Sequence, residues 1–268
     1  MKEFVYRGKP QRLSKITAEH YPLFSYNAII KLIKDKELRV DGVKVGDDVI
    51  VNDGSVVRCY AKDMRLKEVF RDENLLIAYK PKGLKSEGDV SAESIVREYE
   101  KTAVLCHRLD TNTDGLLIFA LDERAENEIA RGFREGYVEK IYEARVYGKV
   151  RGDTVYRDYL RKNAKEGKVR IFSEKREGAV PVEAAVKVIG YDDNSTLVEV
   201  AIHNGKTHQI RAQLAAHGHF ILGDGKYGRD DINAVFGVKK QQLTAKKLVF
   251  SFDEKSFLYY LNGKNIEL

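Results

Sequence analysis

The most informative segment of this sequence reads His107-Arg108-Leu109-Asp110-Thr111-Asn112-Thr113-Asp114-Gly115-Leu116. It lies between two short apolar runs, at residues 104–106 and 116–120, which are typical of buried strands. A single Asp between strands is usually a turn residue, but a histidine, an arginine and hydroxyl side chains accompany this one. Functional side chains often lie on loops that rigid strands hold in place. The segment is therefore our first candidate for a functional site.

On both sides of this loop, from residue 67 to residue 268, the sequence predicts a mixture of short strands and helices. Strands are expected at 75–79, 138–150 and 195–202, and helices between Asp122 and Gly136 and at 207–217. These elements do not follow a strict β-α-β order. We therefore predict an α+β fold with a mixed, largely antiparallel sheet.

The predicted strand 138–150 carries further candidate residues. Alternation of side chains along a strand places Lys140 and Tyr142 on the same face. A tyrosine on a strand is more often a core residue than a catalyst, so the position alone assigns Tyr142 no chemical role.

The predicted helix 207–217 carries another pair of candidates. His208 and Arg211 share one helix face, and Ile210 and Leu214 pack behind them. From composition alone, an exposed arginine is the common case. A guanidinium next to a carboxylate holds it ionised through paired hydrogen bonds.

Residues 10–62 predict a small α+β module, and a polar linker at 61–67 marks the boundary to a second domain at 67–268. Ser25 is a candidate N-cap for a helix that reaches Asp35 and carries an apolar stripe. The dipeptide Asp41-Gly42 between two short apolar runs predicts a tight hairpin.

The segment Arg12-Leu13-Ser14-Lys15, the lysine-rich helix and the hairpin together resemble the RNA-binding module named after ribosomal small-subunit protein four. Lysines on one helix face bind phosphates with an affinity that depends on salt and little on sequence. The resemblance implies RNA-binding roles for Arg12, Lys15, Lys31, Lys34, Lys36, Arg39 and Lys44.

Composition narrows the function classes further. The chain has 268 residues and a formal net charge of +6, which attracts polyanions without specifying one. No apolar run reaches the roughly 18 residues of a membrane span, and the first ten residues lack the apolar core of a signal peptide. Cys59 and Cys106 are too few for a disulfide framework or a four-cysteine zinc site. We expect a cytoplasmic location and no membrane contact.

The loop at 107–116 is similar to the hallmark of the RluA-type pseudouridine synthases, which is His-Arg-Leu-Asp, two variable residues and Thr-Ser-Gly-Leu. Residues 205–211, Gly-Lys-Thr-His-Gln-Ile-Arg, resemble the Gly-Arg-Thr-His-Gln-Ile-Arg of that family. Lys140, Tyr142 and Ala144 match its Lys-x-Tyr-x-Ala pattern. The likeness extends over essentially the whole predicted second domain.

Weaker matches and departures accompany these motifs. Residues 80–83, 222–228 and 241–245 resemble family turns, and we assign them turn or packing roles only. The chain departs from the family pattern at several positions. Tyr79 replaces Asn, Asp114 replaces Ser, Lys206 replaces Arg and Thr244 replaces His.

The resemblance implies an enzyme that isomerises uridine in RNA to pseudouridine without a cofactor or a metal. It makes Asp110 the catalytic carboxylate, which either attacks the anomeric carbon of the sugar or removes a neighbouring sugar proton. Both roles need an ionised carboxylate, for which Arg211 is the expected cation. Tyr142 is implied to stack on the target base and to assist removal of the ring proton. The expected substrate-binding residues are His107, Arg108, Thr113, Lys140 and His208.

The target RNA and two competing interpretations stay open. The family includes enzymes for large-subunit ribosomal RNA and for transfer RNA, and the N-terminal module favours the former. Nothing in the sequence indicates an oligomeric state. One alternative is a metal hydrolase, although the spacing of the histidines fits no metal signature that we recognise: His203, His208, His217 and His219. The other is an RNA-binding or ribosome-assembly factor that has lost its activity.

Overall fold

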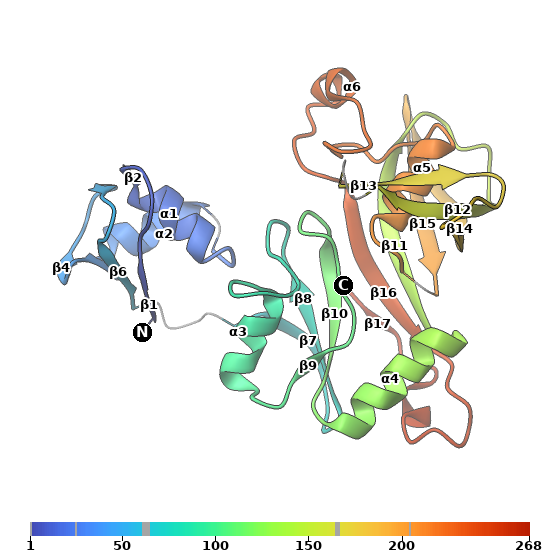
Figure 1. Cartoon of the computed structure of the whole chain (residues 1–268), viewed down its shortest axis with the longest axis horizontal. Coiled ribbons are helices and arrows are strands. Elements are labelled where there is room, and N and C mark those ends of the chain that lie inside the picture. The colour runs from blue at the N-terminus through green and yellow to red at the C-terminus, as the bar shows by residue number, and fades with distance from the viewer. Residues whose placement is uncertain (1, 25, 61–64, 164–166, 204) are drawn as a thin grey trace. The chain divides into compact units, whose positions relative to one another are not determined.

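The computed structural model describes residues 2–24, 26–60, 65–163, 167–203 and 205–268 (Figure 1). The N-cap predicted at Ser25 lies outside the described residues, as does most of the linker predicted at 61–67. None of the helices in the described part of the chain is long and apolar enough to span a bilayer.

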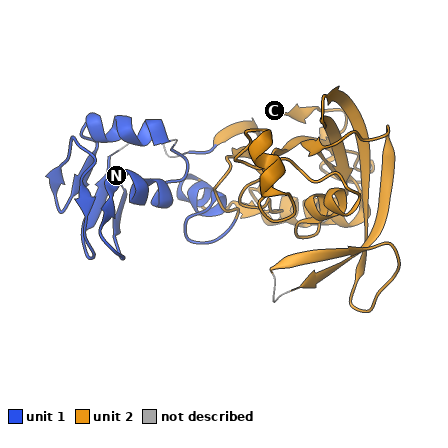
Figure 2. Cartoon of the chain, turned by 90° about the horizontal axis from the view of Figure 1, so that it is seen from above, with its two compact units in different colours: residues 1–66, 87–99 blue, residues 67–86, 100–268 orange. Residues whose placement is uncertain are grey.

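Backbone contacts divide the chain into two compact units (Figure 2). Unit 1 comprises residues 1–66 and 87–99, and unit 2 comprises residues 67–86 and 100–268. The helix α3 (Ala92–Tyr99) thus belongs to unit 1 by its contacts, although the chain enters unit 2 before and after it.

Unit 1 combines helices α1 (Leu13–His20) and α2 (Tyr26–Lys34) with a four-stranded sheet in the order β1-β6-β3-β4. Ile29 and Ile33 of α2 are buried in the core that the helices share with the sheet. The predicted hairpin is confirmed, because Asp41 and the glycine after it have φ of 50° and 83°, as a type I′ turn requires. The strands are β1 (Lys2–Val5), β2 (Gln11–Arg12), β3 (Leu38–Val40), β4 (Val43–Lys44), β5 (Ile50–Val51) and β6 (Val56–Cys59), of which β2 and β5 form a separate pair.

Unit 2 is built on one large sheet in the order β13-β12-β14-β15-β11-β16-β10-β8-β7, with β9 paired to β10 and β17 paired to β16 (Figure 1). Its described strand pairs are antiparallel except β10 with β16, which is parallel. The predicted α+β fold with a mixed, largely antiparallel sheet is therefore confirmed. The strands are β7 (Lys67–Arg71), β8 (Leu75–Lys80), β9 (Val104–Leu105), β10 (Asp114–Ala120), β11 (Val138–Tyr147), β12 (Thr154–Asn163), β13 (Lys168–Phe172), β14 (Val180–Asp192), β15 (Ser195–Ile202), β16 (Leu243–Phe250) and β17 (Ile266–Glu267).

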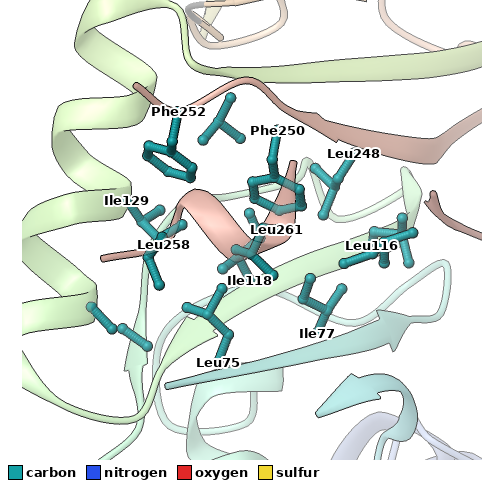
Figure 3. Close-up of a cluster of buried hydrophobic side chains, with 14 residues drawn as sticks. Leu75, Ile77, Leu116, Ile118, Ile129, Leu248, Phe250, Phe252, Leu258 and Leu261 are labelled. Carbon is teal, nitrogen blue, oxygen red and sulfur yellow. The ribbon is translucent and has the colours of Figure 1, made fainter. Parts of the chain in front are cut away.

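The main core of unit 2 lies where helix α4 (Glu123–Glu135) packs on the sheet. Side chains from β8, β10, β16 and α4 meet there with those of the C-terminal segment, and Figure 3 shows Ile129 of the helix among them. The Asp122 carboxylate caps this helix by accepting from the Ala125 amide at 2.7 Å, and Gly136 ends it at φ 82°, as the sequence predicts. Of the two strands that flank the loop at 107–113, β10 packs in this core and β9 pairs with β10. The remaining helices are α5 (Gln209–Ala216), α6 (Asp230–Val235) and the 3-10 turn η1 (Tyr259–Leu261).

Two predicted boundaries are wrong. The strand predicted at 138–150 ends at Tyr147, because Gly148 turns the chain with φ 74°. The helix predicted at 207–217 begins at Gln209, because His208 has the left-handed φ of 55°. His208 is therefore the residue before the helix and does not share a helix face with Arg211.

Candidate active site

Asp110 lies in the loop between β9 and β10, which is held by a hydrogen bond within the loop and by contacts from two other segments. The amide of Thr113 donates to the Asp110 carbonyl at 3.0 Å, and its buried hydroxyl accepts from the Gln241 side chain at 2.7 Å. The Ser86 hydroxyl donates to the Leu109 carbonyl at 2.8 Å and accepts from the Leu109 amide at 2.9 Å. The Asp110 side chain is left 24% exposed on a fixed backbone.

The end of the loop is fixed by a glycine and a buried lysine. Gly115 has φ 124°, and a Cβ there would overlap the Ala245 backbone, so only glycine lets β10 pair with β16. The fully buried Lys80 ammonium donates to the carbonyls of Leu84 at 2.8 Å and Thr111 at 3.3 Å. Burial lowers the pKa of Lys80 to about 8. The turn at 80–83 thus holds the loop that carries Asp110. From the sequence alone we assign this turn a turn or packing role only.

Arg211 lies beside Asp110, at the start of α5. Its Nη1 donates to Asp110 Oδ2 at 2.6 Å, and its Nε and Nη2 donate to the two carboxylate oxygens of Asp224 at 2.7 and 2.8 Å. The Arg211 side chain is 9% exposed and that of Asp224 is fully buried. Burial opposes the charge of Arg211, but the hydrogen bonds and charges of the two carboxylates outweigh it and raise its pKa.

Asp224 is the residue that the sequence interpretation missed. Burial opposes its ionisation, but Arg211 and the amides of Lys226 and Tyr227 outweigh this and lower its pKa below the usual 3.8. The turn can pack this tightly because Gly228 has no Cβ. A Cβ at this position would overlap the Asp224 carbonyl. The motif at 222–228 was visible in the sequence, but its Asp had no recognisable partner there.

Tyr142 lies on β11, paired with Val200 of β15 and Ala245 of β16. It is buried, and burial together with the charge of Asp110 raises its pKa. Tyr142 is therefore a neutral phenol at neutral pH. A neutral phenol is a potential hydrogen-bond donor.

The other expected substrate-binding residues have distinct environments. His107 accepts from the Ile118 amide at 3.2 Å, and burial with the charge of Lys140 lowers its pKa to about 3, so its ring is neutral. Arg108 is exposed on the loop. His208 lies near Asp110, with 3.9 Å between its Nε2 and the Asp110 Oδ2.

Lys140 is buried on the same face of β11 as Tyr142. Its Nζ lies 4.2 Å from the centre of the Phe133 ring, and burial lowers its pKa to about 8. Burying an ammonium group is unfavourable, and a site that binds an anion is a common reason for retaining one.

We expect Lys140→Met to be more stable than the wild type at pH 7, by on the order of 3 kcal/mol. The unfolded chain binds a proton at Lys140 up to pH 10.5 and the folded chain only up to about pH 8. The destabilisation by Lys140 is therefore complete below pH 8 and is lost as the pH rises toward 10.5. Urea unfolding at pH 7, 9 and 10.5 measures the difference, with the exposed Lys239→Met as control. A stability gain that is independent of pH would contradict this account.

Three of the positions that depart from the family pattern form one cluster. The Asp114 carboxylate accepts from the Tyr79 hydroxyl at 2.9 Å and from the Thr244 hydroxyl at 2.8 Å. The Lys82 ammonium lies 3.6 Å from the same carboxylate. Each oxygen of the Asp114 carboxylate accepts from one of the two hydroxyls, so the three departures are connected by hydrogen bonds. This cluster ties β8, β10 and β16 together at the end of the loop.

The four histidines that suggested a metal site lie in separate environments. His208 is near Asp110, His217 contacts Asp158 at 3.1 Å, and His203 lies 3.6 Å from Glu139. His219 contacts the Tyr147 carbonyl at 3.1 Å. Within the described ranges, no three His, Cys, Asp or Glu side chains are close enough together to hold a metal ion.

In unit 1, most of the basic residues expected to bind RNA are exposed. Arg39 is half-buried, with its guanidinium 4.7 Å from the centre of the Tyr60 ring. The Nη1 of Arg12 donates to the Asp48 carbonyl at 2.9 Å. The exposed residues of the set are Arg12, Lys15, Lys31, Lys34, Lys36 and Lys44.

Comparison with known proteins identifies the family. The profile of the RNA pseudouridylate synthase family matches residues 74–216, which is more than half of the chain. The dual-specificity RNA pseudouridine synthase RluA of Yersinia pestis is 32% identical over 195 residues, which cover 69% of this chain and 92% of that protein. The ribosomal large subunit pseudouridine synthase C of Rickettsia conorii is 28% identical and covers 82% of this chain and 83% of its own.

A solved structure shares the fold. Human RNA pseudouridylate synthase domain containing 1 superposes with a TM-score of 0.62 at 24% identity, covering 76% of this chain and 82% of that one. This structural match shows the shared fold alone, and the sequence matches show the family. The chain belongs to the RluA-type RNA pseudouridine synthases, and it is an enzyme of that family.

Proposed function

We propose that this protein converts specific uridines of large-subunit ribosomal RNA to pseudouridine, with Asp110 as the catalytic carboxylate. The observation that carries this proposal is the Asp110–Arg211–Asp224 chain of hydrogen bonds. A fixed, buried cation keeps one carboxylate oxygen in place and leaves the group partly exposed for a substrate.

The reaction needs one anionic oxygen and no external reagent. The bond between N1 of uracil and C1′ of ribose breaks, and a bond between C5 and C1′ forms. C5 loses its proton and N1 gains one, so atoms and electrons balance. Asp110 either attacks C1′ or removes the proton at C2′, and the Arg211 fork supports the ionised carboxylate in both cases.

Tyr142 and Lys140 complete the proposed site. The neutral phenol of Tyr142 provides a ring on which an extruded uracil stacks, and such stacking contributes about 1–3 kcal/mol per base. The buried ammonium of Lys140 on the same strand face supplies positive charge for an anionic part of the nucleotide.

We further propose that residues 10–62 form the RNA-binding module and that 67–268 form the catalytic domain. The exposed lysines of α1 and α2 support an electrostatic grip on phosphates, which suits RNA that is recognised by shape. The names of several relatives favour large-subunit ribosomal RNA as the target. Transfer RNA is the second candidate target, because the family that the sequence resembles includes enzymes for it.

We expect a variant with Lys15, Lys31 and Lys34 changed to Gln to bind RNA more weakly and with less dependence on salt. Each phosphate contact contributes about 0.7–0.9 to the slope of log affinity against log salt, so three lost contacts reduce the slope by about 2. Filter binding at several salt concentrations measures this slope. The control variant changes three exposed lysines of unit 2 to Gln: Lys101, Lys239 and Lys255. An unchanged slope in the first variant would assign the grip elsewhere.

The proposed function is tested by tritium release. Ribosomal and transfer RNA carrying uridine tritiated at C5 are incubated separately with the enzyme, and chemical mapping then locates the pseudouridine. We expect release with large-subunit ribosomal RNA in amounts that match one or a few mapped sites. Release from transfer RNA alone would correct the target. No release from either would favour an inactive RNA-binding factor.

A further inference from the structure

His208 has a backbone conformation that residues other than glycine rarely adopt. Its φ and ψ are 55° and 18°, in the left-handed region that non-glycine residues enter only when their surroundings hold them there. The holding contact is a hydrogen bond of 2.9 Å between His208 Nδ1 and the Tyr227 hydroxyl. This backbone turns the imidazole off the helix and toward Asp110.

The hydrogen bonds of Tyr227 fix the tautomer of this imidazole. The Tyr227 oxygen accepts from the Val169 amide at 2.8 Å, so its one hydrogen is available for His208 Nδ1. With Nδ1 as acceptor, the Val169 amide, the Tyr227 hydroxyl and His208 Nδ1 each have a hydrogen-bond partner. The ring hydrogen of a neutral imidazole is then on Nε2. Burial lowers the pKa of His208, and its ring is therefore neutral at neutral pH.

The Nε2 atom faces the space next to the Asp110 carboxylate. Its distance of 3.9 Å from Asp110 Oδ2 is too long for a hydrogen bond, and among the described residues Nε2 has no other acceptor. The charges that act on the ring besides Asp110 are those of Arg211, Lys226 and Asp224. A donor of fixed orientation thus points into the place where the substrate must approach Asp110.

We propose that His208 Nε2 donates a hydrogen bond to the 2′-hydroxyl of the target uridine, which makes His208 a further catalytic residue. The inference rests on the proposed function, in which Asp110 acts at C1′ or at C2′ of the ribose. The 2′-oxygen is bonded to C2′, so it lies beside the Asp110 oxygen in both cases, within reach of Nε2. This contact selects ribose over deoxyribose at the reacting nucleotide.

The test compares two RNAs that differ in one oxygen. Stem-loops with the mapped target as uridine or as 2′-deoxyuridine, tritiated at C5, are given to the wild type and to three variants. His208→Asn keeps a residue that tolerates the left-handed backbone but does not reach the substrate, whereas His208→Gln carries an amide donor near the Nε2 position. We expect His208→Asn to lower kcat/KM about tenfold on uridine and less than about twofold on deoxyuridine. His208→Gln should recover part of the loss.

A third variant, at Tyr227, tests whether the tautomer of His208 matters. Tyr227→Phe removes the group that fixes the tautomer and should reproduce part of the loss, on uridine only. An equal loss on both RNAs, as a phosphate contact or a folding defect would produce, overturns the inference, and so does no loss on either. If deoxyuridine is not turned over, dissociation constants in an Asp110→Asn background are compared in the same way. Wild-type enzyme that releases no tritium from uridine overturns the proposed function instead.

Discussion

Asp110→Asn is expected to abolish turnover while RNA binding stays within about threefold of the wild type. The amide has nearly the same size and still accepts from Arg211 Nη1, while Nε and Nη2 of Arg211 keep their hydrogen bonds to Asp224. What is lost is the negative charge that attacks C1′ or takes the proton at C2′. Removing a group of this kind typically lowers kcat by about 10⁴-fold or more. Tritium release under single-turnover conditions gives the rate, and filter binding gives the dissociation constant.

The second carboxylate of the same segment is the matched control. Asp114 accepts from two hydroxyls and lies next to Lys82, and it points to those groups instead of to Arg211. Asp114→Asn keeps one accepting oxygen, and its NH2 group can donate to the oxygen of the other hydroxyl. We therefore expect kcat to stay within about tenfold of the wild type, the size of one weakened charged hydrogen bond. If Asp110→Asn kept a near-normal rate, or if both variants were equally inactive, the assignment of Asp110 would be wrong.

The sequence predicted those parts of the fold that local chemistry determines. The type I′ turn at Asp41, the cap at Asp122 and the end of α4 at Gly136 each depend on residues within a few positions of one another. The α+β class followed from the order of such elements. The alternation of β11 was likewise readable, because its buried residues recur at every second position.

What the sequence did not predict depends on partners that folding brings together. Asp224 looked like a turn residue, because its partner Arg211 is recognisable only once α5 and the turn at 222–228 lie side by side. His208 was assigned to the helix, since its pairing with Tyr227 is what holds it in a left-handed backbone. For Asp224 a distant contact added a role to a correctly predicted turn, and for His208 a distant contact overrode the helical pattern.

The region 151–194 shows a different limit. Its three strands, β12 to β14, were not predicted, and the exposed residues of β14 include Val180 and Ile189. Apolar residues on the exposed face blur the alternation that identifies a strand. The three departures at 79, 114 and 244 were each visible, but only their hydrogen bonds reveal that they form one cluster.

Asp224→Ala is expected to be the most destabilising single change in the site. It leaves the Arg211 guanidinium buried with Asp110 as its remaining carboxylate, and breaking a buried ion pair by removing one partner typically lowers stability by about 3–5 kcal/mol. The fork also loses two of the three hydrogen bonds that orient it. We therefore expect kcat to fall by about 10²-fold, the effect of misplacing a catalytic group by a small distance.

The pH dependence of this effect separates the ion pair from simple loss of packing. Because the folded state lowers the pKa of Asp224 below 3.8, its contribution to stability is complete above pH 3.8 and is lost as the pH falls through the folded-state value. The difference between wild type and Asp224→Asn in urea unfolding should therefore be largest at pH 7 and should shrink in acid. The control is Asp253→Asn, whose partly exposed ion pair with Arg131 should contribute much less to stability. A difference for Asp224→Asn that did not change with pH, or that did not exceed the control, would mean that Asp224 fills space without holding Arg211 in its charged, oriented state.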